Sequence, residues 1–597
     1  MRHPLAFGIA AVLAAGRALA APTDTVDIPF ERFTLPNGLT VVVHEDHKAP
    51  VVAVSVWYHV GSKDEKPGKT GFAHLFEHLM FQESENHRDE YFRPFELAGA
   101  TDMNGTTWLD RTNYFETVPT TALDMALWME SDRMGHLLGA IDQKTLDEQR
   151  GVVQNEKRQG ENQPYGKVDE RIQLASFPEG HPYRWETIGS MADLNAASLD
   201  DVKQWFKDYY GAANTTLVLA GDIDAKTARE KAQQYFGDIP AGPPVTRRKA
   251  WVAPRSESTR DTMQDRVAQT RVYKSWNVPP NFSAALNELG LAAQVLGGGK
   301  TSRLYERLVY RDRIADSVSV SVQPFELASL FQLQVDVKNG VDPAQVEAAV
   351  NEEWQRFLDK GPTEDELKRA KTDIHAGFIR AVEKVGGFGG KAVTLAEGQV
   401  YAGDPGAYKR DFAAVDAATP ASVQATARQW IARGDYTLTV TPFEKYSTSA
   451  STVDRKAGVP KVDNFPALSF PSLQRGKLKN GIEVVLAERH SIPVVQLSML
   501  FDGGYAADQG RKLGTSSFTM AMLDEGTKSL DALQIARRQE ELGARIGSSA
   551  GLDTNSVTLS ALKSQFKPSL ALYADIVRHP AFTAQDMERL RGQWLAG

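Results

Sequence analysis

Residues 74 to 78 read His-Leu-Phe-Glu-His, which places two imidazoles and a carboxylate within little more than one helical turn. His74 and His78 are four residues apart, so on a helix they lie next to each other on one face. Their ring nitrogens can then meet on a single Zn²⁺ ion, and the carboxylate of Glu77 reaches the same place. The order H-x-x-E-H therefore predicts a metal site with an acid or base beside it.

The residues around this motif predict a helix. Apolar side chains recur at i, i+3, i+4, i+7 and i+8 and form one stripe, which leaves the two histidines on another face: Phe72, Leu75, Phe76, Leu79 and Met80. The alternative is a pair of ordinary surface histidines beside a glutamate. A third ligand elsewhere in the chain is needed to decide between the two.

Glu156 is the candidate third ligand. Thr145 followed by Glu148 fits a capping box, which predicts that a helix begins near Thr145. Four residues at helical spacing then form a stripe that we expect to face inward: Gln149, Val152, Val153 and Glu156. An inward glutamate needs compensation for its charge, either from a metal ion or from a buried Arg or Lys.

Four segments together resemble the M16 family of zinc peptidases, which includes pitrilysin, insulinase and mitochondrial processing peptidase. They are HLFEH, VVQNEKRQ some eighty residues later, HPYRWETIGSMADL, and YYGAANTTLVLAGDID. The resemblance runs from about residue 30 to the end of the chain. It implies that His74, His78 and Glu156 bind one Zn²⁺ per chain and that Glu77 is the general base. The family often has an acidic residue at the position of Gln149.

The resemblance also implies a fold class and a substrate contact. The expected fold is α+β, with duplicated M16-type (LuxS/MPP-like metallohydrolase) domains in which mostly antiparallel sheets pack with helices. An asparagine at the position of Asn104 contacts substrate main chain in the family. The alternative is a hairpin turn, since Asn104 precedes Gly105 and Asn-Gly is a strong turn signal.

One family feature is missing from the sequence. The segment that begins at Leu296 usually carries an Arg and, seven residues later, a Tyr, which touch the bound peptide, whereas this chain has Val309 and Asp316. Family members divide the zinc site and this pair between two halves or two subunits. A second M16 subunit, or a C-terminal domain that is apparently missing after Gly597, is therefore a possible partner. The glycines at 297–299 do not match a phosphate-binding loop.

Composition excludes several classes of protein. The net charge is -8 with basic and acidic residues spread through the chain, so we expect no nucleic-acid partner.

Residues 1–20 have a basic start, an apolar centre and an Ala18-Leu19-Ala20 end, which predicts a cleaved signal peptide and a periplasmic or secreted protein. No other apolar run is long enough for a membrane span. Cysteine is absent, so ligands must be histidine and carboxylate.

The chain repeats itself. Residues 35 to 80 align without a gap with residues 478 to 523, an offset of 443 (478 minus 35), and each copy opens with an Asn-Gly turn between strand-like runs. The triplet His74, Glu77 and His78 corresponds to Ser517, Met520 and Ala521, which cannot bind zinc or act as the base. The predicted units are a catalytic zinc domain at 28–245, a second α/β domain without metal at 255–440, a linker at 441–470 and an inactive repeat domain at 471–597.

The sequence thus predicts an exported zinc endopeptidase that acts on peptides or small unfolded proteins. Three protein ligands would leave one zinc position for a water molecule, whose proton Glu77 would accept. The alternative is a binding or assembly subunit that needs a partner half for catalysis. A structural zinc site is less consistent with the motif, because such sites have four protein ligands and no base.

Overall fold

The computed structural model describes residues 26–443, 472–490 and 492–597. The predicted signal peptide at 1–20 lies outside the described residues, as does the predicted linker from residue 444 onward. Among the described helices, none is long and apolar enough to cross a membrane.

The first unit is built on a six-stranded sheet in the order β1-β2-β6-β3-β5-β4. The strands are β1 (Glu31–Thr34), β2 (Thr40–Glu45), β3 (Val51–Tyr58), β4 (Thr101–Thr107), β5 (Thr112–Pro119) and β6 (Thr215–Gly221). All neighbours are antiparallel except β2 and β6, which are parallel. Strand β4 is therefore an edge strand, with one side of its backbone unpaired within the sheet.

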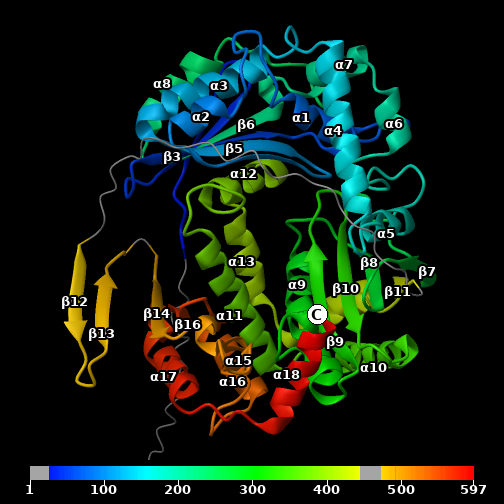
Figure 1. The fold of residues 1–597 in the computed structure, drawn as a ribbon. Helices are drawn as coiled ribbons and strands as arrows, with labels where there is room; N and C mark the ends of the chain where they lie inside the picture. Colours follow the sequence, from blue (N-terminus) through cyan, green and yellow to red (C-terminus); the bar gives the residue numbers. More distant parts are fainter. Residues whose placement is uncertain (1–25, 444–471, 491) are drawn as a thin grey trace, which may run out of the picture.

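Helices cover one face of this sheet (Figure 1). They are α1 (Phe72–Leu79), α2 (Arg93–Leu97), α3 (Leu123–Gly135), α4 (Gln143–Glu161), α6 (Met191–Ala196), α7 (Leu199–Tyr209) and α8 (Ala225–Phe236). Alternate residues of β3, Val52, Val54 and Val56, point into this helical core with Leu75 and Phe76 of α1. The long apolar run of β3 reflects burial on both of its faces.

The second unit has a five-stranded sheet in the order β7-β11-β8-β10-β9. The strands are β7 (Thr259–Asp265), β8 (Arg271–Val278), β9 (Ala315–Gln323), β10 (Ser329–Val337) and β11 (Tyr436–Pro442). Its helices are α9 (Ala284–Gly297), α10 (Pro343–Lys360), α11 (Glu364–Ala381), α13 (Tyr408–Ala417) and α14 (Pro420–Trp430). Strand β11 ends at Pro442, so the predicted boundary at 440 cuts into it. Helix α5 (Val168–Ser176) of the first unit packs on β8 and β11.

Helix α12 (Lys391–Ala402) links the two units. It belongs to the stretch predicted as the second domain, and it packs on the far face of the first sheet (Figure 1). Leu395 and Ala396 share a core there with Ala53, Trp57 and Val218. The stretch predicted as a second α/β domain, residues 255–440, thus shares a hydrophobic core with the first unit across this helix.

Residues 472–597 repeat the first unit, which confirms the duplication. At the same offset of 443 (494 minus 51), β14 (Val494–Asp502) corresponds to β3, and the later elements follow in step: α15 (Thr515–Ala521), α16 (Ala532–Leu542), β15 (Arg545–Ala550), β16 (Thr554–Leu562), α17 (Phe566–Arg578) and α18 (Ala584–Ala596). The predicted Asn-Gly turns are confirmed, with φ of 91° at Gly38 and 92° at Gly481.

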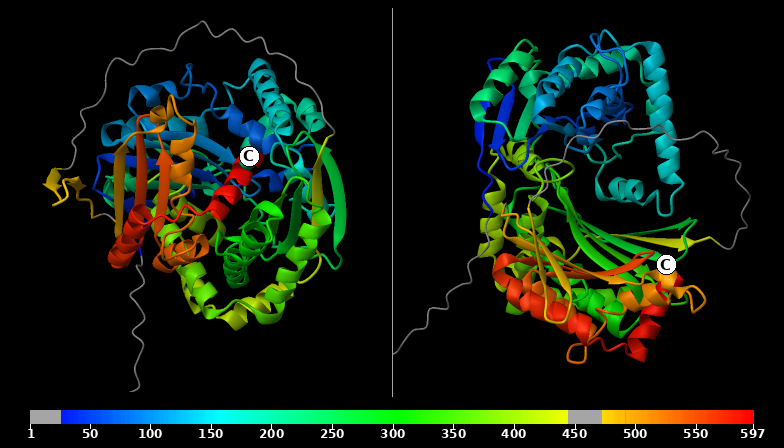
Figure 2. Two further views of the ribbon diagram at one scale, coloured as in Figure 1. Left: turned by 60° about the horizontal axis from the view of Figure 1, so that its bottom comes forward. Right: turned by 60° about the vertical axis from the view of Figure 1, so that its left-hand side comes forward.

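The repeat differs from the first unit in its sheet. Strands β12 (Leu473–Lys477) and β13 (Glu483–Ala487) form a separate pair, while β14, β16 and β15 form a three-stranded sheet. Every residue of β12 and β13 is exposed. In Figure 2 the three-stranded sheet lies beside the second sheet, opposite the first unit. Helix α16 packs on α11, so the repeat is attached mainly to the second unit.

Candidate metal centre

The start of helix α1 is fixed by two contacts. Gly71, the residue before the helix, has φ of 88°, and a side chain there would lie 2.7 Å from the carbonyl oxygen of Ile188. The carboxylate of Glu65 accepts a hydrogen bond from the Ala73 N–H at 2.9 Å. It thereby satisfies one of the free donors at the helix N-terminus.

Helix α1 carries the motif as the spacing predicted. Phe72, Leu75, Phe76 and Leu79 are buried against the sheet. The histidines lie on another face, where the side chains of His74 and His78 remain 13% and 21% exposed. The centroids of their rings are 4.8 Å apart. Both rings are therefore close to one another and open to the solvent side of the helix.

The structure brings Glu156 of α4 to these rings. Its Oε2 atom lies 3.4 Å from His78 Nε2 and 3.8 Å from His74 Nε2. One ligand atom from each of the three residues lies within 4.8 Å of the others. Two ligands of a tetrahedral Zn²⁺ ion are separated by about 3.3 Å, because each bond is about 2.0–2.1 Å long. The three side chains therefore fit a zinc ion, with one coordination position left open.

The protonation of these groups also suits metal binding. Burial, helped by the nearby His78, lowers the pKa of His74 to about 4, so this ring is neutral at pH 7 and keeps a free lone pair. The hydrogen bond with His78 holds the pKa of Glu156 below its usual value. In the part of the chain that the structure describes, Glu156 has ion-pair contacts only with the two histidines. A buried Arg or Lys partner, the alternative to a metal, is not found among those contacts.

Two expectations about α4 are wrong. The helix begins at Gln143, and Asp142 is the cap, because its side chain accepts the Thr145 N–H. Thr145 is thus inside the first turn, and Glu148 lies 3.7 Å from Lys144 instead of capping the helix. Glu156 is not inward: its side chain is 51% exposed. Helix α4 stands at the margin of the unit, where only three of its residues are buried: Leu146, Val153 and Lys157.

Glu77 lies on α1 between the histidines and the sheet. It is 8% exposed, and the hydroxyl of Thr107, at the end of β4, donates a hydrogen bond to its carboxylate. Burial raises the pKa of Glu77, while the bond from Thr107 opposes the rise. A carboxylate with a raised pKa can exchange a proton nearer neutral pH. Sequence reasoning missed Thr107, because nothing in its local pattern indicates which helix faces the end of β4.

Asn104 lies in the middle of strand β4, so the hairpin-turn alternative is wrong. It pairs with Phe115 of β5, and its side chain is exposed with Oδ1 accepting the N–H of Gly105. A β-bulge precedes it, where Asp102 has φ of 54°. Asn104 does not contact the three ligands directly, but it shares the edge strand that ends at Thr107 beside Glu77.

Val309, which stands where the family has its arginine, is not able to contact a bound peptide. Val309 is 2% exposed in the hydrophobic core of the second unit.

In the repeat, helix α15 matches α1, yet the motif positions hold Ser517, Met520 and Ala521. The repeat therefore keeps the fold of the first unit without its metal ligands.

Two histidines and a glutamate around an open position, with a buried glutamate beside them, define a mononuclear metal site of the hydrolytic class. Comparison with known families agrees. A model described as insulinase (peptidase family M16) matches residues 40–181 and 483–596, and one described as peptidase M16 inactive domain matches residues 196–374. The chain belongs to peptidase family M16.

Curated relatives carry corresponding names. Zinc protease PqqE of Helicobacter pylori is 28% identical over 364 residues, which cover 59% of this chain and 80% of the relative. An uncharacterized zinc protease of Streptomyces coelicolor is 23% identical, with 70% and 91% covered. The beta subunit of mitochondrial-processing peptidase of Blastocladiella emersonii is 22% identical, with 62% and 80% covered. These names support a peptidase-type function and a zinc site.

Solved structures share the fold. A protease from Helicobacter pylori has a TM-score of 0.63 at 24% identity and covers 69% of this chain over its whole length. The periplasmic protease PqqL from Escherichia coli has a TM-score of 0.58 at 17% identity, with 95% of this chain and 67% of that chain covered. The duplicated α+β architecture is thus that of M16 proteins.

Proposed function

We propose that this protein is a zinc-dependent endopeptidase that holds one Zn²⁺ per chain and cuts peptides or small unfolded proteins. The observation that carries the proposal is the placement of Glu77. It is buried beside a three-ligand cluster of which only Glu156 is exposed, whereas a purely structural metal site would have no use for an acid or base there.

Each residue of the site would have a different role in the hydrolysis of the peptide bond. Bound zinc would polarise the carbonyl of the peptide bond and lower the pKa of a water molecule in the open position. Glu77 accepts a proton from the attacking water and then delivers it to the leaving amine. Thr107 holds the Glu77 carboxylate in place through its hydroxyl. His74, whose pKa is lowered to about 4, is neutral at pH 7 and remains available as a ligand over a wide pH range.

Strand β4 suits an extended substrate. It is the edge of the first sheet, and it ends beside Glu77. A peptide that adds to this edge through main-chain hydrogen bonds would run past the metal ligands. Asn104, exposed on the same strand, could then contact the main chain of the peptide. If it does, the Asn104→Ala variant should have a raised KM for the peptide.

A second candidate function is that of a subunit that needs a partner half. Val309, at the position of the family's arginine, is buried in the second core and unable to reach a substrate. Under this alternative the chain binds zinc but cleaves slowly, and adding a second M16 subunit raises turnover without changing the zinc content. Unchanged turnover would argue for the first candidate.

The proposal includes export of the protein to the periplasm or the medium. The signal-type sequence at residues 1–20 supports it. Expression of the full chain in a bacterium, followed by N-terminal sequencing of the protein from the periplasm and medium, tests it. We expect a mature chain that begins near Ala21. A chain that keeps Met1 in the cytoplasm would contradict export.

The peptidase proposal is tested with a mixed library of peptides blocked at both ends. We expect internal bonds to be cut, the cleavage to stop with a chelator, and zinc to restore it. Blocked ends exclude exopeptidase action, so release of internal fragments identifies an endopeptidase. Cleavage that continues after the metal has been removed would contradict the mechanism.

A further inference from the structure

The hydroxyl group that orients Glu77 is attached to a short turn. Thr107, which carries this hydroxyl, is the last residue of β4, and four residues lead from it to Thr112 at the start of β5. Within the turn the N–H of Trp108 donates to the carbonyl oxygen of Arg111 at 2.9 Å. Because Thr107 directly precedes this turn, the contacts that fix the turn also fix the hydroxyl beside Glu77.

The first unit holds the turn through the short 3₁₀ helix η1 (Ser62–Asp64). The first two N–H groups of η1 donate to the carbonyl oxygens of Trp108 and Leu109, at 3.2 and 2.9 Å. The ammonium group of Lys63 donates to the carbonyl oxygen of Asp110 at 2.7 Å. Three consecutive carbonyl groups of the turn are therefore bound from this side.

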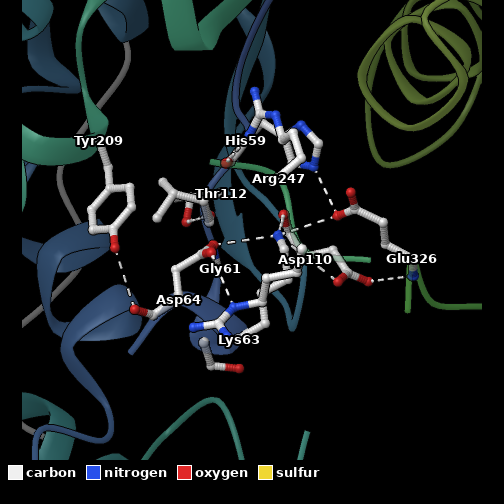
Figure 3. A network of polar contacts seen from close by, with 12 residues as sticks. His59, Gly61, Lys63, Asp64, Asp110, Thr112, Tyr209, Arg247 and Glu326 are labelled. Carbon is white, nitrogen blue, oxygen red and sulfur yellow. Dashed lines mark hydrogen bonds and ion pairs between the residues drawn. The ribbon is translucent and has the colours of Figure 1, made fainter. Parts of the chain in front are cut away.

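The second unit holds the same turn through the side chain of Asp110 (Figure 3). This side chain is buried, and its Oδ2 atom accepts the N–H of Glu326, in the loop between β9 and β10, at 2.9 Å. Its Oδ1 atom accepts a hydrogen bond from the hydroxyl of Tyr183, which in turn accepts the N–H of Leu327 at 2.8 Å. Both oxygens of one carboxylate thus tie the turn to the second unit, directly and through Tyr183.

Lys63 balances the charges of three carboxylates around this link. Its ammonium group lies 3.3 Å from Glu326, 3.3 Å from Asp64 and 3.9 Å from Asp110. Burial acts to lower the pKa of Lys63, but these three charges raise it, so the group stays protonated. Burial raises the pKa of Asp110 to about 6, so its carboxylate is largely ionised at pH 7 and both of its oxygens can accept hydrogen bonds. Removal of one member would leave the other buried charges without a partner, which is costly.

The repeat shows that the turn forms without this side-chain link. At the offset of 443, the first two N–H groups of the 3₁₀ helix η5 (Tyr505–Asp508) donate to the carbonyl oxygens of Gly551 and Leu552, both at 2.9 Å. The residue that follows, Asp553, corresponds to Asp110 but is exposed. The backbone contacts alone are therefore sufficient for the turn.

The side chains that connect the turn with the base have been replaced in the repeat by groups without a charge or a hydroxyl: Ala506, Ala550 and Met520, in place of Lys63, Thr107 and Glu77. The copy that lacks the base thus also lacks the ammonium group and the hydroxyl. The link accompanies the catalytic group and is not a requirement of the fold.

We propose that Asp110 is a positioning residue of the peptidase: it ties the β4–β5 turn to the second unit and thereby holds the Thr107 hydroxyl where it orients Glu77. The inference rests on the proposed peptidase function and gives the second unit, which contributes none of the three ligands, a part in it. Loss of the link lets the turn shift, which misplaces the Glu77 carboxylate but leaves the ligands on α1 and α4 in place.

The first experiment separates kcat from KM. Asp110→Asn keeps the size of the side chain, but its NH₂ group would face a donor, either the Glu326 N–H or the Tyr183 hydroxyl. We expect kcat for a blocked peptide to fall by about 10- to 100-fold, with KM and the zinc content nearly unchanged. An unchanged kcat, or a loss of zinc that accounts for the fall, would overturn the proposal.

Asp64→Asn is the matched control. Asp64 also lies beside the Lys63 ammonium group, but its Oδ2 atom accepts the N–H of Gly61, at 3.1 Å. The variant therefore removes the same charge without breaking a bond to the turn, and its kcat should stay close to the wild-type value. Equal losses of kcat in Asp64→Asn and Asp110→Asn would show that only the charge around Lys63 is important, against the proposal.

Tyr183→Phe serves the same test if Asp110→Asn folds poorly. It removes only the hydroxyl that joins Asp110 to the N–H of Leu327, so the direct bond to Glu326 remains. We expect a smaller fall in kcat than for Asp110→Asn, again with KM nearly unchanged. A folded Tyr183→Phe protein with the wild-type kcat would contradict the role of the link.

A double-mutant cycle tests whether Asp110 acts through Thr107. Thr107→Val removes the hydroxyl and keeps the shape of the side chain, so it should lower kcat by itself. In this background Asp110→Asn should cause little further loss, because the group that Asp110 positions is already absent. Losses that multiply would show that Asp110 acts by another route, and the assignment would be wrong.

Hydrogen exchange separates this inference from the proposed function. Asp110→Asn should speed exchange of the Glu326 and Leu327 amides, whereas Asp64→Asn should not. If this difference is found but the wild-type protein cleaves no peptide, the link stands and the peptidase proposal fails. If the wild-type protein cleaves peptides and Asp110→Asn changes neither exchange nor kcat, the link alone fails.

Discussion

The environments of four side chains set their roles at the centre. His74 and His78 are both partly exposed, and His74 is neutral at pH 7. Glu156 reaches over from the margin of α4 with half of its side chain exposed. Glu77 alone is buried with a hydroxyl donor. A glutamate with an exposed carboxylate suits charge compensation of a cation, whereas a buried one with a raised pKa suits proton transfer.

Glu77→Gln is expected to lower kcat by about 10²- to 10⁴-fold, because the amide is not able to accept a proton. The amide keeps the shape of the side chain, so folding should be unchanged. Steady-state cleavage of a blocked peptide measures the effect. Glu148→Gln, on the exposed side of α4, is the control, and near-wild-type cleavage in Glu77→Gln would contradict the role of this residue.

Glu326 should make stability depend on pH. Despite the opposing effect of burial, its contacts with His59 and Lys63 lower its pKa from 4.5 to about 2 in the folded protein. Its ionised form therefore stabilises the fold fully above pH 4.5, and this contribution is lost as the pH falls toward 2. In urea unfolding, the advantage of the wild-type protein over Glu326→Gln should shrink by at most about 1.4 kcal/mol per pH unit below 4.5. An advantage that is constant between pH 6 and pH 3 would contradict this linkage.

The sequence predicted the positions at the site better than their surroundings. The spacing of His74, Glu77 and His78 is a property of any helix, so three residues could be placed without tertiary information. Glu156 was a candidate from helical spacing, the resemblance to a family implied its role as a ligand, and its predicted burial is wrong. Apolar periodicity marks one face of a helix, but Val152 shows that a helix at the margin leaves part of that face in solvent.

At the scale of elements, the repeat provides a matched comparison for helix α1. Gly71 and Gly514 precede α1 and α15 with φ of 88° and 85°. An added side chain at Gly71 would meet the Ile188 carbonyl oxygen at 2.7 Å, whereas at Gly514 it would meet nothing within 4 Å. The backbone strain is therefore shared, and the close approach to the loop before α6 is unique to the first copy.

Gly71→Ala should therefore lower zinc affinity, while Gly514→Ala should leave it unchanged. In both variants the alanine at positive φ destabilises the fold by about 1 kcal/mol or more, but only Gly71→Ala displaces the helix that carries the histidines. Competition with a chromophoric chelator measures the affinity. Equal affinities in the two variants would show that the contact with Ile188 does not position α1.

Element boundaries show why local patterns are ambiguous. Asp142 and Thr145 are three residues apart and both types are good caps, so the sequence fits two helix starts. The backbone decides between them, because only Asp142 is in an extended conformation before the helix. Likewise Asn104-Gly105 fits a turn locally, and the sheet places it inside a strand.

At the scale of the molecule, one hairpin stands apart from the repeat that contains it. In the first unit β2 pairs with β6, which is also paired with β3. In the described part of the repeat, β12 and β13 pair only with each other, and apolar residues such as Val485 and Leu478 are about half exposed. Isolated two-stranded hairpins are marginal in water.

Hydrogen exchange should reveal this difference. Amides of β13 are expected to exchange orders of magnitude faster than those of β2, because local opening of the hairpin exposes little further surface. Mass spectrometry of peptides from the two copies measures both in one experiment. Equal protection of β2 and β13 would show that the hairpin packs on something in solution.

The architecture was partly readable from the sequence. Duplication followed from the matched residues at a fixed offset, and the α+β class from the resemblance to M16 proteins. The passage of α12 onto the far face of the first sheet was not predicted. Its apolar residues, including Leu395, fit any buried helix, since contacts between residues that are distant in sequence leave no local signal.

Zinc content per chain tests the central claim most directly. Purified wild-type protein, Glu77→Gln, His78→Ala and Glu156→Ala are compared by elemental analysis after dialysis against zinc-free buffer. We predict one zinc per chain in the first two proteins and little or none in the last two. Full zinc occupancy in Glu156→Ala and His78→Ala, or none in the wild-type protein, would contradict the account.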